Sequence, residues 1–270
     1  MKKATKLLLG CLGATAFAIA PAMGGNKEKA KAFIGRNYAH RGLHTEDKQI
    51  PENSLPAFAA ACDAGYGMEL DVQLSKDGEV VVFHDDTLNR VCGVDARVDD
   101  LTLAELKELS LCGTKETIPL FTEVLSMVDG REPLIVELKT GPKNDELCEK
   151  TLAILREYKG EYVIESFDPR IVRWFRVNAP DIIRGQLAMK PERYDQSYPV
   201  WQKFALGNCM MNFMARPNFI AYEIGEYPLL VQLEFLMGAV KVGWTSHENT
   251  HEADHDMVIF EFYKPERFYR

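Results

Sequence analysis

The sequence lacks closely spaced cysteines. It has six, at positions 11, 62, 92, 112, 148 and 209, and no two form a Cys-x-x-Cys pair. A zinc knuckle built on such pairs is therefore not expected. Cys92 and Cys112 flank one loop region and could form a disulfide in a domain outside the cell, with buried free thiols as the alternative.

Positive charge is also scarce. Lys and Arg total 32 against 40 Asp and Glu, which gives a formal net charge of −8 at pH 7. Proteins that bind nucleic-acid backbones need a basic face, so we expect no nucleic-acid partner. An anionic substrate would need a local positive centre. Low-complexity tracts and short-period repeats are absent too, which argues against a disordered chain.

Long apolar runs are absent except at the N-terminus. Three lysines within the first six residues precede an uncharged segment over residues 7–23, which is about as short as a membrane-spanning helix can be. We predict a hydrophobic helix in a signal or anchor segment over residues 1–33, followed by one domain over residues 34–270. A retained membrane anchor with an extracytoplasmic domain is favoured. The alternative is a secreted domain, cleaved just before Pro21.

From residue 37 onward, short apolar runs alternate with amphipathic segments. This pattern predicts strands over residues 38–40, 67–74, 80–84, 134–139, 162–166, 183–188, 219–224, 240–245 and 257–262. A helix is expected from Ser54, as N-cap, to Gly65, as terminator, with further helices over 101–109 and 145–158, each followed by a strand. Interpreting 80–84 as a hairpin extension of 67–74 leaves eight parallel strands. An open doubly wound sheet should carry a glycine-rich phosphate turn, which is not found, so the α/β chain is predicted to form a single-domain (β/α)₈ TIM barrel.

Polar residues interrupt two of these apolar strands. Glu69, Asp71 and Gln73 share one face of their strand at period two, and Glu137 and Lys139 repeat the arrangement in "LIVELK". A buried carboxylate is costly unless it binds a metal, pairs with a cation or lies at an open rim. Each pattern alone has a simpler explanation, such as a salt bridge between Glu137 and Lys139.

Histidines follow two other strands. His40 and Arg41 end "YAHR", and His84 ends "VVVFH", which predicts both histidines at the rim where barrel active sites form. Carboxylate oxygens suit Mg²⁺ or Ca²⁺, two histidines can serve as base and acid, and Arg41 with Lys139 can hold an anion. Together these residue types indicate phosphodiester cleavage.

These residues lie within a set of motifs that resembles the glycerophosphodiester phosphodiesterase family. The motifs follow in order from about residue 38 to 167: His40-Arg41-Gly42, Pro51-Glu52-Asn53-Ser54, Glu69-Leu70-Asp71-Val72, Asp77-Gly78, Val82-Phe83-His84-Asp85, Leu88-Asn89-Arg90, Ile118-Pro119-Leu120, Glu137-Leu138-Lys139 and Ser166-Phe167. The resemblance implies a TIM barrel that uses one divalent cation, Mg²⁺ or Ca²⁺. It also implies hydrolysis of glycerophosphodiesters to an alcohol and glycerol 3-phosphate, through a cyclic phosphate formed by a glycerol hydroxyl.

The resemblance also implies a role for each site residue. His40 and His84 would be the catalytic acid–base pair, and Glu69, Asp71 and Glu137 the metal ligands. Arg41 and Lys139 would contact the phosphate, Trp244 of "GWTSHEN" would flank the pocket, and Glu52 and Asn53 would support His40 and the metal. Ser246-His247 and Phe260-Glu261 depart from the family pattern, which bears on the alcohol side of the pocket.

Substrate and activity have alternatives at this stage. The substrate is either a deacylated phospholipid headgroup or, given the predicted anchor, a lysophospholipid at a membrane surface. A phospholipase D-type lyase that stops at the cyclic phosphate is a second enzyme candidate. A non-catalytic, membrane-tethered barrel that binds metal or lipid headgroups is the third, although a binder needs no acid and base.

Overall fold

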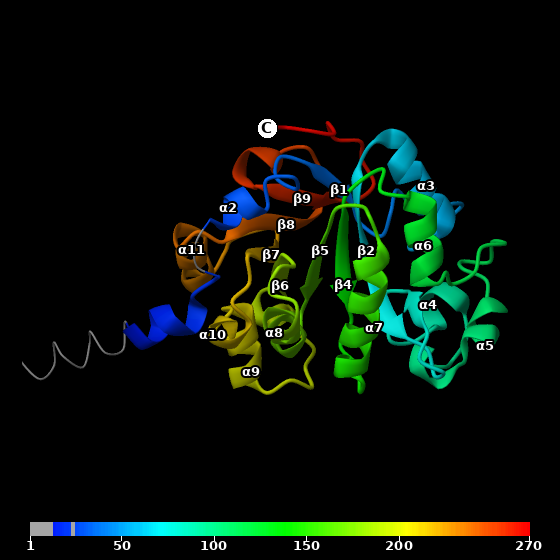
Figure 1. Cartoon of the computed structure of the whole chain (residues 1–270), viewed down its shortest axis with the longest axis horizontal. Helices are drawn as coiled ribbons and strands as arrows, with labels where there is room; N and C mark the ends of the chain where they lie inside the picture. The colour runs from blue at the N-terminus through cyan, green and yellow to red at the C-terminus, as the bar shows by residue number, and fades with distance from the viewer. Residues whose placement is uncertain (1–12, 23–24) are drawn as a thin grey trace, which may run out of the picture.

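The computed structural model describes residues 13–22 and 25–270, and its centre is a closed barrel (Figure 1). The strands are β1 (Asn37–Ala39), β2 (Gly67–Leu74), β3 (Val80–Val82), β4 (Leu134–Leu138), β5 (Tyr162–Ser166), β6 (Arg184–Ala188), β7 (Phe219–Glu223), β8 (Val240–Ser246) and β9 (Met257–Phe260). Within the described residues, eight of them pair in parallel in the order β1-β9-β8-β7-β6-β5-β4-β2, and β1 also pairs with β2, which closes the cylinder. Only β3 differs, because it runs antiparallel to β2 in this part of the chain. The predicted (β/α)₈ barrel is confirmed.

Helices surround the barrel. They are α2 (Asn26–Lys29), α3 (Leu55–Ala64), α4 (Asn89–Cys92), α5 (Leu103–Lys107), α6 (Phe121–Val128), α7 (Asn144–Glu157), α8 (Pro169–Asn178), α9 (Val200–Gly207), α10 (Asn212–Ala215) and α11 (Leu229–Leu236), with 3₁₀ turns η1 (Val98–Asp100), η2 (Pro191–Arg193) and η3 (Glu252–Asp254). As predicted, α3 begins after Ser54, whose hydroxyl accepts from the Ala57 N–H, and ends at Gly65, where φ is 75°.

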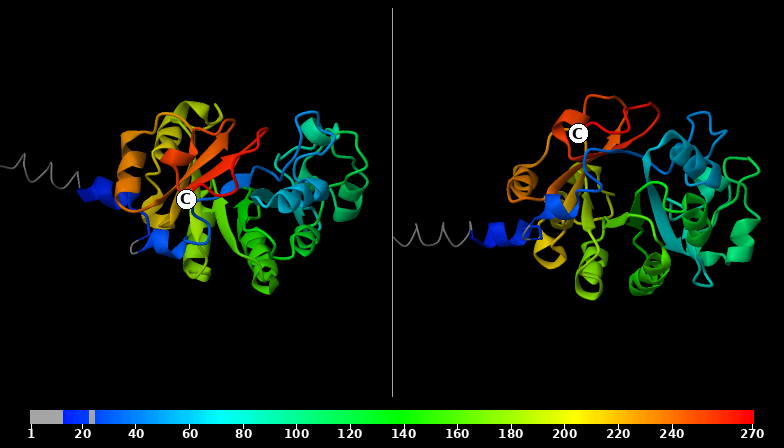
Figure 2. Two further views of the ribbon diagram at one scale, coloured as in Figure 1. Left: turned by 90° about the horizontal axis from the view of Figure 1, so that it is seen from above. Right: turned by 45° about the horizontal axis from the view of Figure 1, so that its top comes forward.

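The segment between β3 and β4 differs from the prediction. The expected helix over 101–109 forms as α5, but α6 follows it before the next strand. Leu106 of α5 packs in a small separate core of the β3–α6 insertion, whereas Phe121 of α6 belongs to the main core together with residues of β2 and β4. The unpredicted α6 is therefore the helix that covers the barrel. Figure 2 shows the α4–α5 insertion on the opposite side of the molecule from α11.

The barrel strands alternate between two apolar environments. Leu70 and Val136 face the outer helices, while Tyr38 and Ile135 belong to a cluster inside the barrel. Phe33, on the N-terminal side of the predicted 33/34 boundary, is buried in that inner cluster, and Tyr38 donates from its hydroxyl to the Phe33 carbonyl at 2.9 Å.

The N-terminal segment lies beside α10 (Figure 1). Residues 1–12 and 23–24, part of the predicted signal or anchor segment, are outside the described residues. Residues 13–19 are helical, and the Arg216 guanidinium lies 4.6 Å from the Phe17 ring centroid. Among the helices that can be described, none combines the length and apolarity needed to cross a bilayer.

Cys92 and Cys112 are free thiols.

Candidate active site

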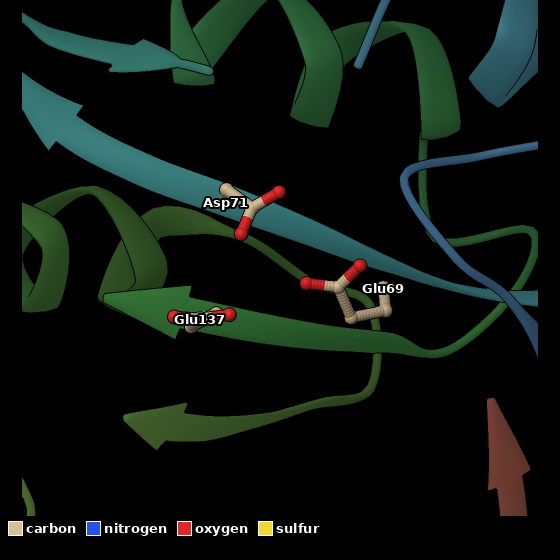
Figure 3. A group of neighbouring side chains, drawn as sticks. All are labelled: Glu69, Asp71 and Glu137. Atoms are coloured by element: carbon tan, nitrogen blue, oxygen red, sulfur yellow. The ribbon is translucent and has the colours of Figure 1, made fainter. Parts of the chain in front are cut away.

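Three carboxylates from neighbouring strands meet inside the barrel. Glu69 and Asp71 are on β2, and Glu137 on β4 pairs directly opposite Asp71. Strand alternation directs all three inward, because the intervening Leu70 faces the outer helices. One oxygen from each carboxylate lies within 4.8 Å of the others (Figure 3). The structure therefore brings the three predicted metal ligands together.

The chemistry of this cluster fits a hard divalent cation. Glu69 is 2% exposed and Asp71 is fully buried. Burial raises the pKa of Glu69 well above its usual range, and the neighbouring charges of Asp71 and Glu137 raise it further. Oδ1 of Asp71 is buried and accepts no hydrogen bond from the residues that the structure describes. Mg²⁺ and Ca²⁺ prefer such oxygen ligands and would offset the repulsion among the carboxylates.

Lys139 and Arg41 flank the carboxylates. Lys139 Nζ is 2.8 Å from Glu137 Oε1 and 3.3 Å from Asp71 Oδ1. Arg41 donates its backbone N–H to Glu69 at 3.0 Å, and its Nε is 3.6 Å from Asp71. Burial opposes ionisation of Asp71, yet the charges of Lys139, His84 and Arg41 lower its pKa below its usual range. The site thus contains two cationic side chains of the kind that hold an anion in an otherwise acidic protein.

His40 directly follows β1 and reaches the cluster. Its Nε2 is 4.0 Å from Glu69, and its Nδ1 is 3.3 Å from Glu261, the residue after β9. Burial and the charge of Arg41 lower the pKa of His40 to about 4, against the opposing effect of Glu261. Glu261 also contacts His44 Nε2 at 2.9 Å, so one carboxylate holds two imidazoles.

His84 arrives from the hairpin rather than from a parallel strand. Because β3 runs back along β2, Phe83 donates its N–H to the Asp71 carbonyl at 3.0 Å. His84 therefore returns to the level of the carboxylates. Its Nδ1 is 2.6 Å from Asp85 Oδ1.

Glu52 and Asn53 support the site in different ways. Asn53 donates Nδ2 to Asp71 Oδ2 at 2.8 Å, which orients a predicted metal ligand. Glu52 accepts from Arg41 at 2.8 Å and from Arg90 at 2.7 Å. Glu52 therefore fixes the predicted phosphate-binding arginine. Its carboxylate pairs with these two arginines and not with His40.

Trp244, the predicted aromatic residue of the pocket, lies on β8. Its ring packs edge-on against Phe167 with centroids 5.6 Å apart. The buried indole Nε1 has no hydrogen-bond partner in the described part of the chain. This position is compatible with an aromatic wall of the pocket.

A family model described as the glycerophosphoryl diester phosphodiesterase family matches residues 40–262. The chain belongs to this family. The match runs through every site residue described above, from His40 to Glu261, and confirms the family suggested by the motifs. The match also covers the second half of the barrel, where the sequence resembles the family less closely.

Curated relatives in the glycerophosphoryl diester phosphodiesterase family cover part of the chain. The glycerophosphodiester phosphodiesterase of Caldanaerobacter subterraneus subsp. tengcongensis is 37% identical over 161 residues, which are 55% of this chain and 65% of that protein. Lysophospholipase D GDPD1 of Rattus norvegicus is 33% identical over 152 residues, 51% of this chain and 46% of that protein. The matched region thus spans about half to two thirds of these curated relatives.

Solved structures of family members share the fold over most of the chain. A phosphodiesterase of Oleispira antarctica, in complex with the product sn-glycerol-3-phosphate, has a TM-score of 0.70 at 24% identity and covers 86% of this chain and 94% of that one. The glycerophosphodiester phosphodiesterase of Thermotoga maritima has a TM-score of 0.62 at 26% identity, covering 83% and 93%.

Several site residues of this glycerophosphoryl diester phosphodiesterase family member were not predicted from the sequence. Glu165 on β5 pairs opposite Glu137 and is 1% exposed. Its position within "YVIES" repeats the period-two signal that identified Glu137, and could have revealed it. Glu261 was visible only as a departure from the family pattern. Asp85 contacts His84 and Arg90. Apart from the Val82-Phe83-His84-Asp85 motif, nothing in the sequence indicated these contacts.

Proposed function

We propose that the chain is a metal-dependent phosphodiesterase that hydrolyses glycerophosphodiesters to an alcohol and glycerol 3-phosphate. Deacylated phospholipid headgroups and lysophospholipids both carry the required bond. The supporting observation is the buried cluster of Glu69, Asp71 and Glu137, with His40 beside it and His84 returning to its level. One divalent cation, Mg²⁺ or Ca²⁺, is the proposed cofactor.

The carboxylates would hold the cation, and the flanking cations would hold the substrate. When bound, the cation neutralises charge on the phosphate oxygens. Lys139 and Arg41 bind the remaining phosphate oxygens, with the Arg41 guanidinium fixed by Glu52. Trp244 borders the pocket and excludes water from one side. Asn53 keeps Asp71 oriented.

The two histidines move the protons. A carboxylate contacts Nδ1 of each ring, Glu261 for His40 and Asp85 for His84. This leaves Nε2 of each ring to exchange a proton with the substrate. One histidine accepts the proton of the attacking hydroxyl as the new P–O bond forms, and the other donates a proton to the departing alkoxide. If the attacking hydroxyl belongs to glycerol, a cyclic phosphate forms first and water opens it in a second step.

Turnover by the full chain tests the proposal. Purified protein should release glycerol 3-phosphate from glycerophosphocholine or glycerophosphoethanolamine, lose this activity with chelator and regain it with Mg²⁺ or Ca²⁺. His84→Ala should lower kcat by about 10²- to 10⁴-fold, whereas His251→Ala, at a histidine that pairs with the exposed Glu248, should not. A product that stays cyclic would indicate the lyase instead. No release from a panel of such diesters with either metal would refute the proposal.

Cation binding and turnover, measured on the same variants, separate an enzyme from a metal-binding barrel. A ligand present at 100 times its Kd adds about 2.7 kcal/mol to the unfolding free energy, so the melting temperature should rise with Mg²⁺ or Ca²⁺. Asp71→Asn should abolish this rise, and His84→Ala should keep it. A non-catalytic barrel would show the same rise but no turnover to lose.

We also propose that residues 1–33 direct the chain to a membrane and place the domain outside the cytoplasm. The support is the set of N-terminal lysines before an uncharged segment. Carbonate extraction and protease accessibility of the full chain in its host test this. A soluble chain that is protected from external protease would contradict it.

A further inference from the structure

An apolar groove lies beside the active-site end of β5 and β6. Its walls come from the loop after β5 and from the long segment between β6 and β7, which contains α9 and α10. The cavity volume is about 390 Å³, within the usual range for small-molecule sites of about 300–1,000 Å³. Tyr194, Trp201, Leu206 and Met211 are among the side chains that line it.

The groove leaves large apolar side chains in water. The Trp201 side chain is 71% exposed and Tyr198 is 39% exposed. Contiguous exposed apolar surface on a soluble domain usually marks a binding site. On the outer side of α9, Val200 and Phe204 are also exposed, by 79% and 53%, but they do not line the groove.

The groove lies next to residues that adjoin the active site. Thr140, which follows Lys139 in the chain, forms part of its wall. The Phe167 ring packs edge-on against Trp244 at 5.6 Å on one side and against Tyr194 at 6.4 Å on the other. Three packed aromatic rings thus run from Trp244 on β8 through Phe167 to Tyr194 in the groove.

The lining favours an aliphatic occupant over a charged one. Its two charged residues, Asp168 and Arg170, form an ion pair with each other at 2.6 Å. A choline group would gain little from this neutralised carboxylate, although aromatic rings attract quaternary ammonium groups. Leu206, Met211 and Met214 add flexible aliphatic surface that suits a hydrocarbon chain better.

We propose that this groove binds the single acyl chain of a lysophospholipid whose phosphodiester lies at the carboxylate cluster. The inference rests on the proposed function and names its substrate class: an acylated glycerophosphodiester is preferred over a deacylated one. The acyl chain enters the groove either from a monomer in solution or from a lipid surface.

Chain-length dependence of turnover is the first test. With the full chain, kcat/KM should rise from glycerophosphocholine through octanoyl, decanoyl and lauroyl lysophosphatidylcholine, all kept below their micellar concentrations. A fully buried methylene strengthens binding about fourfold, so the octanoyl substrate should exceed glycerophosphocholine by roughly tenfold or more. Equal values across the series would overturn the proposal.

Paired variants on α9 locate the effect. Trp201→Ser should lower the ratio of kcat/KM for the lauroyl substrate to that for glycerophosphocholine by about tenfold, the effect of roughly 55 Å² of lost apolar contact. The Val200→Ser/Phe204→Ser double variant removes similarly exposed side chains outside the groove, and should leave the monomer ratio unchanged. If that double variant lowers turnover of vesicle-bound lysophospholipid alone, the acyl chain is taken from a lipid surface. An unchanged ratio in Trp201→Ser would overturn the proposal.

Binding without turnover separates this inference from the proposed function. His84→Ala should bind alkylphosphocholines with affinity that increases with chain length, measured by calorimetry, and Trp201→Ser added to it should weaken this dependence. Length-dependent binding in a wild type that hydrolyses no diester would support the groove and refute the phosphodiesterase. Binding that follows the choline group and not the chain length would refute the groove.

Discussion

Replacing Glu261 by Gln tests whether one carboxylate controls the proton transfer at His40. Glu261 follows β9, and its Oε1 lies 3.3 Å from His40 Nδ1 and 2.9 Å from His44 Nε2. Glutamine keeps the shape of the side chain but removes its charge. The imidazolium that His40 becomes during turnover would then lose its stabilising partner.

The structure sets the expected size of the effect. The His40 and Glu261 side chains are each 16% exposed, so water screens their interaction only in part. A hydrogen bond to a charged group is worth about 1.5–3 kcal/mol. At about 1.4 kcal/mol per tenfold, Glu261→Gln should lower kcat by about 10- to 150-fold.

Steady-state kinetics at saturating cation measure this effect. Glu223→Gln is the matched control, because Glu223 ends β7 and pairs with Arg193 instead of a histidine. The control should keep kcat within about threefold, as surface ion pairs contribute little. The concentration of cation for half-maximal activity should not change in Glu261→Gln, since Glu261 lies outside the carboxylate cluster. A loss confined to cation affinity, or a kcat like that of the control, would refute the reasoning.

Three other substitutions test the surroundings of the site and the fold. Asn53→Ala removes the 2.8 Å hydrogen bond to Asp71, and should weaken cation affinity by about 10- to 100-fold in a calorimetric titration. Burial raises the pKa of Glu234 well above its usual range, so the folded state holds a proton that the unfolded state releases, and wild-type stability falls as pH rises. Glu234→Gln should therefore gain stability relative to wild type between about pH 5 and 8, by at most about 1.4 kcal/mol per pH unit in urea unfolding; a gain that shrinks with pH would contradict this. Ser54→Ala removes the N-cap bond to the Ala57 N–H, and should cost about 0.5–2 kcal/mol in the same assay.

Local sequence patterns predicted most of the fold. The period-two polar pattern over residues 67–74 matches β2 in extent, and Ser54 and Gly65 bound α3 as expected. The α6 helix was missed because the amphipathic segment over 101–109 seemed to supply the helix before β4. In the structure that segment packs on its own small core within the insertion, so its apolar face did not indicate the main core.

Long-range contacts account for the parts of the site that the sequence did not predict. Side-chain periodicity placed Glu69, Asp71 and Glu137 on inward faces, and parallel pairing of β2 with β4 then brought them together. The contact between His40 and Glu261 joins the two ends of the barrel domain, and it exists only because β1 pairs with β9 when the barrel closes. A single sequence carries no local signal for such a contact.

Inside the barrel, one layer of inward-facing side chains is apolar and the next layer along the strands is acidic. Ile135 and Val163 pair at one level, and two residues further Glu137 pairs with Glu165. Burial and the charges of Glu137 and Asp71 raise the pKa of Glu165 well above its usual range, because a charge on Glu165 is unfavourable at this buried position.

The three proposed ligand carboxylates of Glu69, Asp71 and Glu137 lie beside the cationic side chains of Lys139 and Arg41. Their formal sum is one negative charge, which a divalent cation would convert to one positive charge. That value matches the single negative charge of a phosphodiester. Without a cation, like charges remain close together in a buried site, so cation binding should also stabilise the fold. The same arrangement that makes these carboxylates costly to bury therefore supports the proposed divalent cation and the proposed singly charged diester.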